Sequence, residues 1–148
     1  MKQQKISNWL KGIAIALALL GLFIIIVITI HRLRPFILFS WYAALVICYL
    51  ILSYFWKVCT EIGRGNSFSN ENATHFHKMA LCGIVLAIGF LAKFFVLLIL
   101  YKVPLIHIQT FLCICEVFAG IIFAVLCEAL SKLILHAYEM KQENELTI

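Results

Sequence analysis

Charge is the scarcest feature of this 148-residue sequence. Only 13% of its residues are charged and 64% are hydrophobic, whereas an average soluble domain has roughly 25% charged residues. A soluble domain of this size could not bury so much apolar surface, because small domains hide only about two-thirds of the surface that their unfolded chains expose. The composition therefore excludes a soluble enzyme, a disordered chain, a collagen-like fibre and a secreted disulfide mini-protein. It favours an integral membrane protein.

Motifs that carry chemistry are missing as well. The sequence has no nucleophile–base motif, no phosphate-binding glycine loop and no paired carboxylates, so we expect no catalytic residues and no enzyme. Its six cysteines include no C-x-x-C pair, and Cys113 and Cys115 would point apart on a helix, so they could not readily share a metal ion. We therefore expect no metal and no cofactor. Basic stripes with interleaved aromatic residues are also absent, which argues against direct nucleic-acid binding.

Four apolar runs are long enough to cross a bilayer. They cover residues 12–30, 35–56, 79–100 and 103–127, and a hydrocarbon core about 30 Å thick needs about 20 helical residues. The runs are apolar on every face, whereas membrane β-strands alternate apolar and polar residues. The sequence therefore predicts one all-α integral membrane domain over residues 1–148. Because the connections after the first and third runs are short, we expect two antiparallel hairpins.

The positive charges predict the orientation. With four spans, the N-terminus, the middle loop 57–78 and the tail 128–148 lie on one side. That side carries eight of the twelve Lys and Arg residues, against three on the other side and Lys93 within the third run. Lys and Arg accumulate on the cytoplasmic flanks of membrane proteins, so we expect both termini and the middle loop to be cytoplasmic.

Lys93 and Glu116 are the two charges expected deep in the bilayer. A charge at that depth costs about 2.5–3.5 kcal/mol on insertion scales. Counted from a turn near Val103 and Pro104, the two residues differ in depth by about 3 Å at helical rise, so they could pair. Three readings remain open: an ion pair that fixes the register of the third and fourth helices, a site for an ion, proton or polar ligand, or two independently snorkelling side chains.

The middle loop contains the signals of a helix end and a helix start. Glycine readily adopts the positive φ that closes helices, Ser69 is a good N-cap, and Glu71 suits the positive end of the helix dipole. We expect the third helix to start in the cytosol and the fourth to extend into it. This region is either a well-made helix start or a docking surface for a cytosolic partner. The candidate docking residues are Gly65, Phe68, Ser69, Glu71, Asn72, Glu143, Glu145 and Leu146.

The chain resembles the bacterial four-helix membrane family named domain of unknown function 2975. Two segments carry the resemblance, Gly65-Asn66-Ser67-Phe68-Ser69-Asn70-Glu71-Asn72 and the terminal Lys141-Gln142-Glu143-Asn144-Glu145-Leu146-Thr147-Ile148. The resemblance implies a multi-pass protein of the bacterial inner membrane. Family members often accompany a small helix-turn-helix transcription regulator, while their biochemical activity is not established. The resemblance implies nothing about Lys93 and Glu116, so their role is argued from geometry alone.

These observations lead to one main hypothesis and two alternatives. The main hypothesis is a non-enzymatic membrane protein that binds a cytosolic partner and acts as a membrane-side regulator of a helix-turn-helix transcription factor. The alternatives are an immunity protein against a membrane-active peptide and a small oligomeric transporter or channel. The lipid bilayer is one expected partner. A homo-oligomer is also expected, because four helices make only a minimal bundle. Gly83, Gly89 and Gly120 allow close helix approach, although none forms a G-x-x-x-G pair.

Overall fold

The computed structural model describes residues 2–30, 35–104 and 107–146, and these residues form four long helices without any strand. The helices are α1 (Lys2–Ile30), α2 (Pro35–Gly63), α3 (Asn70–Ile99) and α4 (Ile108–Leu146). Each is long and apolar enough to cross a membrane. The prediction of an all-helical, multi-pass membrane protein is therefore confirmed.

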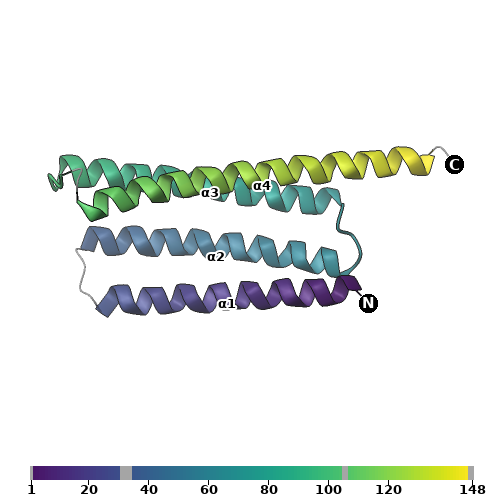
Figure 1. Cartoon of the computed structure of the whole chain (residues 1–148), viewed down its shortest axis with the longest axis horizontal. Helices are drawn as coiled ribbons and strands as arrows, with labels where there is room; N and C mark the ends of the chain where they lie inside the picture. Colours follow the sequence, from purple (N-terminus) through teal and green to yellow (C-terminus); the bar gives the residue numbers. More distant parts are fainter. Residues whose placement is uncertain (1, 31–34, 105–106, 147–148) are drawn as a thin grey trace.

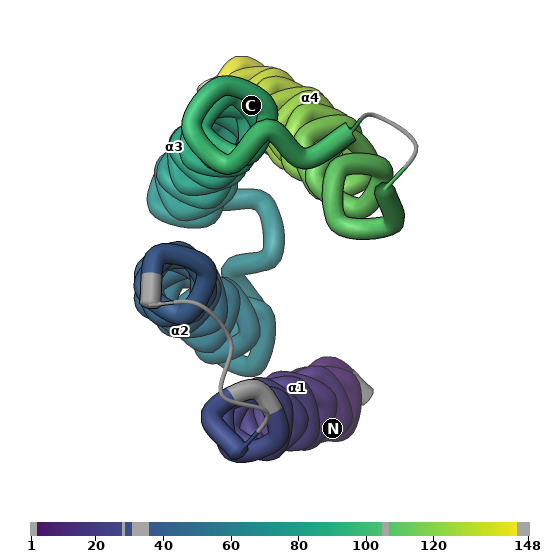
Figure 2. Tube along the Cα trace, turned by 90° about the vertical axis from the view of Figure 1, so that its left-hand side faces the viewer, coloured from purple at the N-terminus to yellow at the C-terminus, as the bar shows by residue number. Residues whose placement is uncertain are grey.

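The four helices form an open arc. In Figure 1 they run alongside one another in chain order, with α1 against α2, α2 against α3 and α3 against α4. The α3–α4 contact is the most extensive of the three. Seen end on in Figure 2, the row curves, and among the described residues α1 contacts no helix except α2. The minimal bundle expected from the sequence is thus not closed, and its concave side stays open between α1 and α4.

Glycines allow α3 and α4 to approach closely. A Cβ atom added to Gly83 would lie 3.2 Å from the Gly120 carbonyl oxygen, and one added to Gly120 would lie 3.2 Å from the Gly83 carbonyl oxygen and from Ala87. Small residues let membrane helices pack backbone against backbone. Cys113 and Cys127 are free thiols that serve as small hydrophobes in two buried clusters, whereas Cys48 and Cys115 are exposed.

Most of the 57–78 connection between the predicted spans is helical, as its helix-end and helix-start signals predicted. Helix α2 continues to Gly63 and α3 begins at Asn70, so the non-helical linker consists of residues 64–69. Gly65 adopts a positive φ of 87°, the conformation that favours glycine. Ser69 caps α3, as predicted, because its hydroxyl oxygen accepts a hydrogen bond from the Asn72 backbone N–H.

Helix α4 follows the turn that was predicted near Val103 and Pro104. The apolar span was predicted to begin at Val103, whereas α4 itself begins at Ile108. Proline lacks a backbone N–H and disfavours helical geometry in the residue before it, so Val103 and Pro104 stay in the turn. The Pro104 carbonyl instead accepts bonds from the His107 N–H at 3.0 Å and the Thr110 hydroxyl at 3.2 Å. The predicted turn at 31–34 and residues 105–106 lie outside the described residues.

Candidate functional site

The pair formed by Lys93 of α3 and Glu116 of α4 is the first candidate site. The Lys93 ammonium donates to Glu116 Oε2 at 3.0 Å, and the two side chains are 7% and 19% exposed. The ion pair expected from their similar depth is therefore present. Since each charge compensates the other away from water, the pair relieves most of the cost of placing either one in the bilayer.

Two aromatic rings complete the surroundings of the Lys93 ammonium. Its nitrogen lies 5.0 Å from the ring centroid of Trp41 on α2 and 5.3 Å from that of Phe90 on α3. Cation–π contacts at such distances contribute about 0.5–2 kcal/mol each, more when they are shielded from water. Trp41 was not among the predicted site residues. Its position in the second run was a usable signal, but nothing in that run indicates which face of the helix turns toward Lys93.

Hollows border the ion pair, and α2 helps to line them. A small one of about 170 Å³ is lined by Trp41, Lys93 and Glu116 among others. A larger one of about 510 Å³ is lined by all four helices and also reaches Glu116. Its walls are otherwise almost wholly apolar, with Leu20 and Phe123 as examples. The described residues contain no group of three or more metal-ligating side chains. The apolar walls therefore suit an ion pair that sets the register of α3 and α4 better than a continuous polar path.

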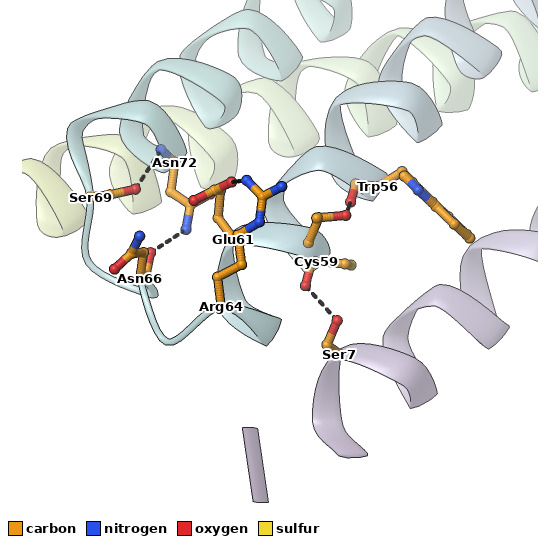
Figure 3. A network of polar contacts seen from close by, with 9 residues as sticks. Ser7, Trp56, Cys59, Glu61, Arg64, Asn66, Ser69 and Asn72 are labelled. Carbon is orange, nitrogen blue, oxygen red and sulfur yellow. Dashed lines mark hydrogen bonds and ion pairs between the residues drawn. The ribbon is translucent and has the colours of Figure 1, made fainter. Parts of the chain in front are cut away.

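A second polar cluster lies at the end of the molecule that contains the linker, hereafter the linker end. Here the Ser7 hydroxyl of α1 donates to the Cys59 carbonyl of α2 at 2.6 Å, and both residues are buried (Figure 3). Gly63 packs so closely on Ser7 that an added Cβ would lie 2.9 Å from its hydroxyl oxygen. Arg64 donates to the Glu61 carboxylate at 2.7 Å. These contacts hold the start of α1 and the start of the linker against the end of α2.

Asn72 holds the linker from inside. Its amide nitrogen donates to the Asn66 carbonyl at 3.1 Å (Figure 3) and to the Ser67 carbonyl at 3.1 Å, and its side chain is fully buried. Of the predicted docking residues, Asn72 is therefore a linker support rather than part of the surface. Gly65, Phe68 and Glu71 are exposed, with Phe68 at 60%, and Ser69 is half-buried.

The end of α4 projects beyond the rest of the molecule. The Ser131 hydroxyl donates to the Ala73 carbonyl at 2.7 Å, near the start of α3. Helix α4 continues from there to Leu146, and its yellow end in Figure 1 extends past α3. We call Lys132–Leu146 the stalk; at a rise of 1.5 Å per residue it is about 22 Å long. Leu133 and Met140 are exposed on it, and Glu143, Glu145 and Leu146 lie in its last turns. Thr147 and Ile148 lie outside the described residues.

The structure brings the predicted docking residues to one end of the molecule. The linker, the start of α1 and the stalk all lie at the linker end in Figure 1, although they are far apart in the sequence. The Lys93–Glu116 pair is separate from them, since Lys93 lies more than 20 residues along α3 from its first residue, or about 34 Å at helical rise.

Comparison with known proteins identifies a family but no characterised relative. No curated protein and no solved structure matches the chain. One family model matches residues 13–148, which include all of α2, α3 and α4. The family is described as protein of unknown function (DUF2975). With the match extending over nearly the whole chain, this four-helix membrane protein belongs to the DUF2975 family.

Proposed function

We propose that this chain is a non-enzymatic protein of the bacterial inner membrane that holds a cytosolic partner at the linker end. In this proposal α1–α2 and α3–α4 cross the membrane as two antiparallel hairpins, with both termini in the cytosol. The orientation is supported by the positive charges, because eight of the twelve Lys and Arg residues flank the linker end of the spans. The stalk and the linker then form the part of the molecule that a cytosolic protein reaches first.

The stalk is the observation that carries the proposal. It extends about 22 Å beyond the last hydrogen bond between α3 and α4, and it exposes Leu133 and Met140 beside charged residues. A helix with exposed apolar and charged side chains suits binding in a groove of a partner protein. Phe68 exposes a further aromatic ring on the linker at the same end.

The proposed partner is a helix-turn-helix transcription regulator. Such regulators present a basic surface to DNA phosphates. The last turns of α4 carry Glu143 and Glu145 against Lys141, so their net negative charge complements that surface. A regulator bound there would be kept at the membrane and away from its operator.

Affinity capture from gently solubilised membranes tests this proposal. We expect the full chain to capture a helix-turn-helix regulator, and a chain lacking residues 143–148 or carrying Phe68→Ser to lose it. The matched control is Phe111→Ser, because Phe111 is equally exposed but lies at the opposite end of the molecule. The proposal fails if the truncated chain and the Phe68→Ser variant capture the same proteins as the full chain.

A further inference from the structure

The α3–α4 pair carries a second groove that neither α1 nor α2 lines. Its volume is about 750 Å³, and it extends along α3 from His77 to Leu91 and along α4 from Lys132 to Val117. Leucine, isoleucine, valine and alanine side chains form nearly all of its wall. This groove is distinct from the hollows beside Lys93 and Glu116, which residues of α2 also line.

The length of the groove matches one leaflet of a bilayer. From His77 to Leu91 the helix rises over 14 residues, or about 21 Å. Half of a bilayer, with its headgroup region, is about 20–22 Å thick. A groove that starts at the linker end of the α3 span and is apolar over this depth fits a lipid chain lying along the two helices.

The polar groups of the groove all lie at its linker end. His77 Nδ1 lies 2.7 Å from Glu128 Oε2, and Lys132 Nζ lies 3.8 Å from Glu128 Oε1. The Lys132 side chain is 77% exposed and its contact with Glu128 is long, so it can turn to another anion at little cost. The groove mouth thus presents a carboxylate and an ammonium group side by side.

We propose that this groove binds one phospholipid whose zwitterionic headgroup carries a primary ammonium. The acyl chain lies against the apolar wall, the phosphate contacts Lys132, and the ammonium donates hydrogen bonds to Glu128. A quaternary ammonium has no N–H to donate, and an anionic headgroup without an ammonium meets the Glu128 carboxylate unfavourably. The mouth therefore distinguishes headgroups of the same chain length, and this site goes beyond the cytosolic docking proposed above.

Native mass spectrometry of the purified full chain tests the headgroup preference. The probes are dioleoyl phosphatidylethanolamine, phosphatidylcholine and phosphatidylglycerol, each titrated in mixed micelles. We expect one phosphatidylethanolamine per chain, favoured by about two- to fivefold over the other two, the effect of one partly exposed ion pair. We expect Glu128→Gln to remove the preference for phosphatidylethanolamine over phosphatidylcholine. We expect Lys132→Gln to weaken the binding of both of these lipids. Lys78→Gln is the control, because Lys78 lies at the same end and does not line the groove.

A second pair of variants tests the groove itself. Ile121 lines it and Ile122 does not, and both are exposed on α4. We expect Ile121→Trp to lower the binding of all three lipids and Ile122→Trp to leave it unchanged. Equal binding of phosphatidylethanolamine and phosphatidylcholine to the unaltered chain overturns the proposal. So does equal lipid binding by the two tryptophan variants, or a dimer mass that Ile121→Trp alone abolishes, since the groove would then hold a second copy.

Discussion

Removing one charge of the Lys93–Glu116 pair should destabilise the protein far more than removing both. Lys93→Met leaves the Glu116 carboxylate without a cation, and Glu116→Gln leaves the Lys93 ammonium without an anion at 7% exposure. A stranded charge at this depth costs about 2.5–3.5 kcal/mol on insertion scales. Lys93 keeps its contacts with Trp41 and Phe90, which offset about 0.5–2 kcal/mol each. We therefore expect Glu116→Gln to be the milder single change.

The double variant Lys93→Met, Glu116→Leu separates pairing from packing. Replacing a buried ion pair by apolar residues of similar volume is often neutral or stabilising. We expect the double variant to regain at least half of the stability that the more harmful single variant loses. A double-mutant cycle uses the unaltered chain, the single variants Lys93→Met and Glu116→Leu, and the double variant. Their free energies of unfolding, measured by reversible unfolding in mixed micelles, give the coupling energy of the pair. Glu139→Gln is the control, because Glu139 is exposed on the stalk and its loss should cost less than about 0.5 kcal/mol. Additive losses in the double variant would refute a register-setting pair.

Three other predictions test the fold and its orientation. Gly120→Val should destabilise the α3–α4 contact by about 1–3 kcal/mol in thermal unfolding, because its side chain meets Ala87 and a backbone oxygen at 3.2 Å, whereas Gly89→Ala, with nothing within 4 Å, should be tolerated. Unchanged stability of the Gly120 variant would contradict the close packing. Asn72→Ala removes two hydrogen bonds to the linker and should cost about 1–3 kcal/mol locally, so trypsin should cut faster after Arg64 in the folded protein. An unchanged cleavage rate would show that Asn72 does not hold the linker. A reporter that is active only in the periplasm should be silent when fused to the C-terminus, and activity there would reverse the proposed orientation.

The sequence predicted those features that depend on length, depth or local chemistry. Run lengths predicted four helices, and residue spacing from one shared turn predicted that Lys93 and Glu116 meet. The Ser69 cap follows from a hydroxyl beside free backbone N–H groups, which needs no tertiary information. Each of these features depends only on sequence distance, either within one helix or from one shared turn.

The contacts between distant segments could not be predicted in this way. Ser7 with Cys59, Ser131 with Ala73 and Trp41 with Lys93 all depend on how each helix is rotated about its axis. A helix that is apolar on every face carries no periodic signal that indicates its buried side. The open arc was missed for the same reason. The turn before α4, by contrast, was predictable from Pro104, because proline constrains its own residue and the one before it.

The unequal packing along the row of helices has a consequence for biogenesis. Synthesis delivers α1 and α2 first, yet the most extensive contact joins α3 to α4 and forms only when both are in the membrane. A nascent chain that has not reached Gly120 lacks the glycine contact that brings α3 and α4 together. Because the stalk is translated after that residue, a protein that recognises the stalk meets only chains in which both sides of the glycine contact have already been synthesised.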